Sequence, residues 1–340
     1  MSLRALVVLA ALGCSAPATP RAVAEAEALD HAGRDDEAAH AYAEAAARHC
    51  GHDARWCAGA LAGQASALVR LGRPAEAAAT YERIPSEAPG QPEPAASALV
   101  AAGGLRLELG EEVRAYQLFW RALVEFPDET AAEDALRHVV RDGRRRNPRQ
   151  LHDVLRDLHA RLGGTAVGDN LLFAMADLSE KDLADPLGAV DACDRLAALY
   201  PGSPLRDDAL WIAARLLRGR GDAEGALRRL RALLATRETA WIVGSYHSVH
   251  LDDAQLEAGV LLRDELGRPR EAVAEFERVG VDYPESTLRD DAIMELAATH
   301  AVLGDRARAC AALGELARRF PDSKHGLERA PSLRAKLDCH

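Results

Sequence analysis

The sequence predicts an all-α protein, an α-solenoid of about eight antiparallel helical hairpins with a C-terminal capping helix. The 340 residues are 48% apolar but only 4% aromatic, so alanine and leucine, both strong helix formers, supply most of the apolar content. Runs rich in valine, isoleucine, tyrosine and threonine, which are typical of strands, are almost absent. Glycine, small-residue and aromatic-proline positions also recur about every 38 residues, which indicates a repeat array.

The first 13 residues have the pattern of a secretory signal. Arg4 precedes a short apolar run, and small residues lie before Cys14. The run is too short to span a bilayer. Residues 11–14 (Ala-Leu-Gly-Cys) resemble the lipobox of bacterial lipoproteins, in which the cysteine is lipidated after residues 1–13 are removed; here the leucine lies two residues before the cysteine rather than three. The alternatives are a plain signal peptide cleaved nearby and a buried first helix.

A flexible tether is expected over residues 14–21. This segment is low in complexity and rich in alanine and proline, and its seven residues after the cysteine reach at most about 25 Å. The folded part would therefore lie close to a membrane. Ser15 resembles the outer-membrane sorting pattern, so we expect a lipid-anchored protein of the cell envelope, at the outer membrane and facing the periplasm.

The repeats are expected over residues 22–322. Each copy has a turn glycine, a small residue five positions later, an apolar residue four after that, and an aromatic-proline pair. The glycine ends the first helix in a left-handed conformation, the small residue lets the two helices approach, and the proline stops the second helix. The expected hairpins are 22–50, 56–89, 94–127, 130–163, 168–201, 204–237, 251–284 and 287–321, followed by a capping segment over 323–340. The small positions are Ala38, Ala77, Ala115, Leu151, Ala189, Ala226, Ala272 and Ala309, and the turn positions are Gly33, Gly72, Gly110, Gly143, Ala184, Gly221, Gly267 and Gly304.

With small, aromatic, small and proline positions at Ala115, Phe119, Ala122 and Pro127, the pattern resembles the tetratricopeptide (TPR) repeat. The resemblance implies a right-handed solenoid that binds proteins or peptides and has neither catalytic residues nor a cofactor. The Tyr-Pro-x-Ser form of the junctions also looks like the repeats of outer-membrane lipoproteins of β-barrel assembly, and of periplasmic proteins that work with the Tol–Pal system.

A binding groove is expected on the concave face, which the first helix of each hairpin should line. The repeat register places on it Asp208, Trp211, Arg215, Arg218, Glu257, Leu261, Asp291 and Met294. Charged and apolar groups mixed in this way suit an extended or helical peptide. The alternative is an ordinary protein surface.

The even spacing of the repeats is broken by about eight extra residues within 239–250. This insertion holds Trp241, Tyr246, His247 and His250, and inserted loops in solenoids often carry function. Partner contact and a longer connection packed on the groove wall are both open. An enzymatic or ligand-binding site there is the alternative from another functional class. No carboxylate or nucleophile accompanies the histidines at a recognisable spacing.

The cysteines suggest two disulfides in an oxidising compartment. Cys50 and Cys57 face each other across one loop, while Cys310 and Cys339 meet if the last segment is an antiparallel cap. Cys193 occupies an apolar slot and is expected to be buried. A metal site at Cys50 and Cys57 with the neighbouring histidines is the alternative, but the spacing matches no familiar zinc pattern, so no metal is predicted.

The charge pattern argues against nucleic acid as a partner. The net charge is −11, and no basic face is apparent. One arginine run could meet acidic lipid headgroups or simply form a solvated turn; it comprises Arg141, Arg144, Arg145, Arg146 and Arg149. The sequence therefore predicts a membrane-tethered scaffold for envelope proteins, with a cytosolic TPR adaptor as a further alternative.

Overall fold

The computed structural model describes residues 19–235 and 250–339. Within these ranges the chain forms seventeen α-helices and two π-helical segments, and no strand. The predicted all-α fold of repeated hairpins is confirmed. The chain divides into an N-terminal unit, Met1–Val139, and a C-terminal unit, Val140–His340. No helix in the described part of the chain is both long and apolar enough to cross a membrane.

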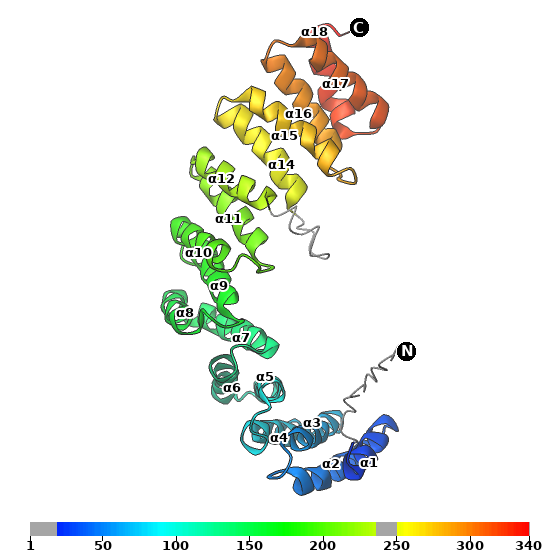
Figure 1. Cartoon of the computed structure of the whole chain (residues 1–340), viewed down its shortest axis with the longest axis vertical. Coiled ribbons are helices and arrows are strands. Elements are labelled where there is room, and N and C mark those ends of the chain that lie inside the picture. The colour runs from blue at the N-terminus through cyan, green and yellow to red at the C-terminus, as the bar shows by residue number, and fades with distance from the viewer. Residues whose placement is uncertain (1–18, 236–249, 340) are drawn as a thin grey trace, which may run out of the picture. The chain divides into compact units, whose positions relative to one another are not determined.

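In the N-terminal unit, each helix packs against the next along the chain (Figure 1). Its helices are α1 (Arg21–His31), α2 (Asp35–His49), α3 (Ala54–Arg70), α4 (Pro74–Glu87), α5 (Pro92–Glu108) and α6 (Glu112–Glu125), and the boundary between the units falls within α7 (Thr130–Arg146).

The C-terminal unit repeats this arrangement, and its last elements form the cap (Figure 1). The elements are α8 (Pro148–Leu162), α9 (Gly168–Lys181), α10 (Pro186–Leu199), α11 (Arg206–Gly219), α12 (Ala223–Leu234), α14 (Leu251–Val260), η1 (Leu261–Glu265), α15 (Pro269–Asp282), α16 (Arg289–Val302), α17 (Arg306–Arg319), η2 (His325–Arg329) and α18 (Ala330–Leu337).

Most turns within hairpins have the predicted left-handed residue. Positive φ angles between 63° and 80° occur at Gly33, Gly72, Gly110, Gly221, Gly267 and Gly304. Ala184, which replaces glycine once, has a φ of 51°. A side chain in this conformation is strained, so the repeat geometry overrides local preference there.

Gly143 does not form the predicted turn. It lies inside α7, and the turn instead follows at Asn147, whose side chain accepts a hydrogen bond from the backbone N–H of Gln150 and so caps α8. A Cβ at position 143 would lie 2.8 Å from Cδ1 of Leu151. In the fourth hairpin the small residue at the helix crossing is therefore Gly143 of the first helix. It makes room for Leu151 of the second helix, which replaces the usual alanine.

The aromatic-proline pairs end the second helices as expected. Phe126, Tyr200, Tyr283 and Phe320 are the C-cap residues of α6, α10, α15 and α17. The aromatic residue inside a second helix has a different role. Phe119 is fully buried against Gly103 of α5 and stacks on His138 of α7, with ring centroids 4.0 Å apart.

In the C-terminal unit, the serine after each aromatic-proline pair joins consecutive hairpins. Its hydroxyl accepts a hydrogen bond from the backbone N–H two residues later and donates one to the second residue of the preceding hairpin's first helix. The three donor–acceptor pairs are Ser203 with Asp169 (2.5 Å), Ser286 with Asp252 (2.7 Å) and Ser323 with Asp290 (2.6 Å). Each serine thus orders its junction and links it to the hairpin before.

The C-terminal segment covers the end of the last hairpin. Leu333 and Leu337 of α18 pack on a buried cluster that includes Leu313 and Leu316 of α17. Ala330 is the only buried residue of this eight-residue helix.

Candidate functional site

A hollow of about 320 Å³ lies between α11 and α14, the first helices of consecutive hairpins. Trp211, Ala214, Leu256 and Val260 supply apolar surface, and Leu230 of α12 also contributes. The charged lining residues are Arg215, Arg218, Asp253 and Glu257. The site is thus an apolar recess with charges around it.

Trp211 is held at the hollow by a residue of the next hairpin. The imidazole of His250 stacks on its indole, with ring centroids 5.2 Å apart and an angle of 7° between the planes. Nε2 of His250 lies 2.9 Å from Oδ1 of Asp208, three residues before the tryptophan on α11. This hydrogen bond fixes the imidazole and, through it, the orientation of the indole.

The two arginines of the hollow are held by carboxylates of neighbouring first helices. Arg218 pairs with Glu257 of α14 and, at 2.7 Å, with Glu265 of the π-helical segment η1. Arg215 lies 2.5 Å from Glu180 of α9. Because their charges are compensated, these arginines shape the wall of the hollow and are not free anion-binding groups.

The structure brings together four of the residues that the sequence placed on the binding face and one from the predicted insertion. Trp211, Arg215, Arg218 and Glu257 line the hollow, and His250 stacks on the tryptophan. Trp241, Tyr246 and His247 lie outside the described residues, so the predicted role of the 239–250 insertion stays a prediction.

Two residues predicted for the groove surface are buried instead. Met294 is 3% exposed and packs in the core with Ala297 and Leu313. Leu261 is 0% exposed and lies beneath the hollow. Both side chains are apolar and pack into the core, whereas the repeat register predicted that they would face the groove.

Sequence reasoning missed Asp253 and the histidine–aspartate pairing. Asp291, predicted for the same face, lies 2.7 Å from Nε2 of His325, which matches the His250–Asp208 pair two hairpins earlier. In the aligned repeats His250 and His325 occupy the position that leucine fills elsewhere. That change of residue type at an aligned position was the available signal.

The chemistry of the hollow is that of a binding surface. Among the described residues, its lining contains no serine, threonine, cysteine or lysine that could act as a nucleophile beside the His250–Asp208 pair. The remaining described thiol, Cys193, is 1% exposed, and burial raises its pKa to about 12. This thiol stays protonated and unreactive at neutral pH.

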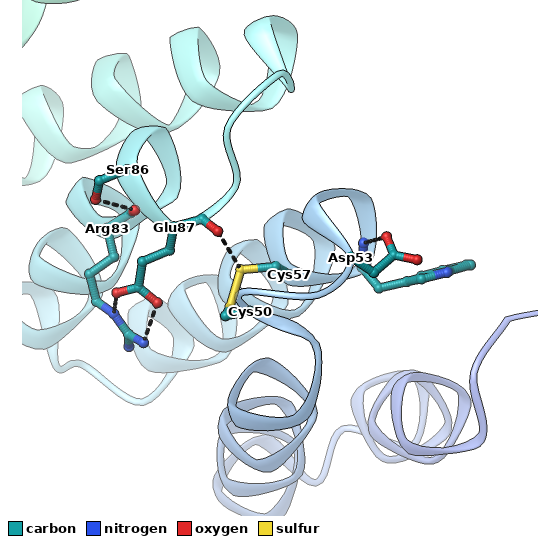
Figure 2. Close-up of a disulfide and its surroundings, with 7 residues drawn as sticks. Cys50, Asp53, Cys57, Arg83, Ser86 and Glu87 are labelled. Carbon is teal, nitrogen blue, oxygen red and sulfur yellow. Dashed lines mark hydrogen bonds and ion pairs between the residues drawn. A yellow bond between two sulfur atoms is a disulfide. The ribbon is translucent and has the colours of Figure 1, made fainter.

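The other four described cysteines form two disulfides. Cys50 is joined to Cys57 and Cys310 to Cys339. Figure 2 shows the first bridge beside Glu87, whose carbonyl oxygen lies 3.5 Å from Sγ of Cys57. Sulfur atoms in a disulfide cannot act as thiolate ligands, so this group does not form a metal site in the oxidised protein.

The arginine run is largely neutralised by nearby acids. Arg144 pairs with Asp177 and Asp182, while Arg145 and Arg146 both pair with Asp142. This arrangement favours a solvated turn over a surface for acidic headgroups.

Comparisons with known proteins agree with the repeat architecture. The tetratricopeptide repeat model matches residues 253–286 and 291–323, the two hairpins that follow the insertion. No curated protein matches the chain. These two hairpins are therefore tetratricopeptide repeats, a class typical of protein-binding scaffolds rather than enzymes.

Similar solved structures are all-helical repeat proteins. A tetratricopeptide repeat protein from Parabacteroides merdae is 16% identical, with 94% of this chain and 98% of that chain covered and a TM-score of 0.30. The C-terminal part of a TPR repeat-containing protein from Cytophaga hutchinsonii is 11% identical, with coverage of 90% and 98% and a TM-score of 0.41. YrrB, a TPR protein with an unusual peptide-binding site, is 15% identical, with coverage of 74% and 97% and a TM-score of 0.38.

Proposed function

We propose that this protein is a protein-binding scaffold of the bacterial cell envelope, and that it holds its partner at the hollow between α11 and α14. The observation that carries the proposal is the half-buried indole of Trp211, held by His250, in an apolar recess whose arginines are already paired. A rigid aromatic anchor within a recess is the usual centre of a protein interface.

The envelope location rests on chemistry at other places in the chain. The segment ending at Cys14 has the features of a lipoprotein signal, and two disulfides are compatible with an oxidising compartment. We propose that lipid on Cys14 tethers the repeats to a membrane, with the outer membrane as the expected site.

Site-specific photo-crosslinking in the cells that express the protein tests the binding role. A photoreactive phenylalanine analogue at Leu256 of the hollow should form a discrete adduct, and the adduct should disappear when Trp211→Ala is added. The same analogue at the exposed Val302 is the control and should not form this adduct. An adduct that survives Trp211→Ala, or none at Leu256, would contradict the assignment of the hollow.

Metabolic labelling with palmitate tests the tether separately. Label should enter the wild-type chain and be lost in Cys14→Ala, with the protein moving from the membrane to the soluble fraction. If the wild type takes up no label, the lipoprotein proposal is wrong. Fractionation with cytosolic proteins would then favour the adaptor alternative.

A further inference from the structure

Equivalent aspartates line three consecutive first helices of the C-terminal unit. They are the third residues of their helices: Asp208 of α11, Asp253 of α14 and Asp291 of α16. The three carboxylates thus occupy equivalent positions in consecutive hairpins, and their partners can be compared directly.

Two of the three carboxylates have a partner in the next hairpin. Oδ1 of Asp208 lies 2.9 Å from Nε2 of His250, and Oδ1 of Asp291 lies 2.7 Å from Nε2 of His325. For Asp253 the aligned position is Leu288, whose side chain cannot donate a hydrogen bond. The middle member of the row therefore lacks the donor that its two neighbours have.

Nothing else in the described part of the chain replaces that donor. The Asp253 carboxylate makes no hydrogen bond or ion pair there, and the nearby imidazole of His250 already binds Asp208. Neighbouring acids, in contrast, are engaged: Asp252 accepts from Ser286, and Glu257 pairs with Arg218. Asp253 is exposed, and partial desolvation followed by the charge of Asp252 raises the pKa of its carboxyl above the ordinary value.

Asp253 also lines the hollow itself, with the apolar side chains of Leu256, Val260 and Trp211. A ligand that enters the recess would bring its own groups beside this carboxylate. Complementarity then requires an apolar side chain for the recess and a cation for its rim.

We propose that the hollow binds a peptide segment of a partner protein in which a lysine or arginine lies next to a large apolar residue. The apolar side chain fills the recess against Trp211, and the ammonium or guanidinium group pairs with Asp253 and so completes the row of compensated aspartates. This inference rests on the proposed function and specifies the chemistry of the partner.

The test uses a phage-displayed library of random dodecapeptides selected on the full-length, oxidised chain. The peptides retained should be enriched in lysine or arginine beside leucine, isoleucine, methionine or phenylalanine. Synthetic copies with a fluorescent label then give dissociation constants by anisotropy. Replacing the basic residue by norleucine keeps the aliphatic stem and removes the charge.

Asp253→Asn should weaken binding of the basic peptides roughly three- to tenfold, because one partly exposed ion pair is lost. It should leave the norleucine peptides unchanged. Asp191→Asn is the matched control: it removes the same charge from the exposed face of α10, where the side chain is 71% exposed, and should have little effect. Trp211→Ala should weaken both peptide series.

The remaining outcomes separate this inference from the function on which it rests. Retained peptides that are neutral or acidic, or that bind equally well to Asp253→Asn, would overturn the basic specificity while leaving a Trp211-dependent binding hollow intact. If no retained peptide depends on Trp211, both the inference and the binding role of the hollow fail. Concentration-dependent dimers abolished by Asp253→Asn would identify a second copy of the chain as the occupant and would also overturn it.

Discussion

The C-terminal helix α18 should depend on the Cys310–Cys339 disulfide for its attachment. The helix has eight residues, too few to persist alone in water. Its other ties are weak: Ala330 is its only buried residue, and the ion pair from Arg306 to Asp338 joins two exposed side chains. We therefore expect that the serine pair Cys310→Ser with Cys339→Ser releases the cap while the hairpins stay folded.

The size of the effect follows from the chain that the bridge closes. With a sequence separation of 29 residues, the loop-entropy model assigns the bridge at most about 3.6 kcal/mol, or roughly a 400-fold change in the opening equilibrium, because part of that loop stays folded in α17. Packing adds little to this, because Leu333 and Leu337 are only partly buried. Without the bridge, the open cap should predominate.

Hydrogen exchange measured by mass spectrometry gives the readout. In the oxidised wild type, amides of residues 330–337 should be protected, and in the double serine variant they should exchange near the intrinsic rate. The pair Cys50→Ser with Cys57→Ser is the control, because it removes a disulfide without touching the cap. Equal protection of α18 with and without the Cys310–Cys339 bridge would show that packing alone holds the cap, and the reasoning above would be wrong.

Three further predictions concern the packing and titration of the C-terminal unit. Gly143→Ala should destabilise the protein by about 1–3 kcal/mol in urea unfolding, because the new Cβ meets the Leu151 side chain, and Leu151→Ala should restore part of the loss; additive effects would contradict this contact. Burial and the nearby Arg195 lower the pKa of His159, whose Nε2 lies 2.9 Å from the Tyr200 hydroxyl, so at this site the unfolded chain binds a proton more readily than the folded chain. The stabilising contribution should therefore be complete above about pH 6.5 and should be lost as the pH falls toward the pKa of the folded state. A His159→Gln variant whose stability has the same pH dependence would refute this assignment. Cys193 should react with a maleimide only as fast as the protein opens, and labelling as fast as that of an exposed thiol would contradict its burial.

Much of the fold could be predicted because its signals are local. The turn at Gly110 requires a left-handed backbone, which glycine adopts without strain. The proline after Phe126 prevents continuation of the helix. Gly143 misled the prediction because glycine has two uses, a turn and a close approach of side chains. Only the position of Leu151 in space decides between them.

The candidate site was less accessible from sequence because it depends on contacts between hairpins. The register placed Trp211 and Arg218 on one face, and both line the hollow, but it also placed the buried Met294 there, since a shift of one position around a helix changes the exposed face. The sequence does not distinguish Asp253 from Asp208, because each is the second residue of an Asp-Asp pair. The difference lies in the residue at the aligned position of the next hairpin, which is His250 for Asp208 and Leu288 for Asp253.

The serine–aspartate hydrogen bonds between hairpins have a consequence for how this chain can evolve. Ser203, Ser286 and Ser323 each join a junction to the hairpin immediately before it, with the same donor and the same kind of acceptor every time. A hairpin that is duplicated or lost by recombination at these junctions would therefore meet a matching hydrogen-bond partner at once. The length of the array can change by whole hairpins while this hydrogen-bonded junction is kept.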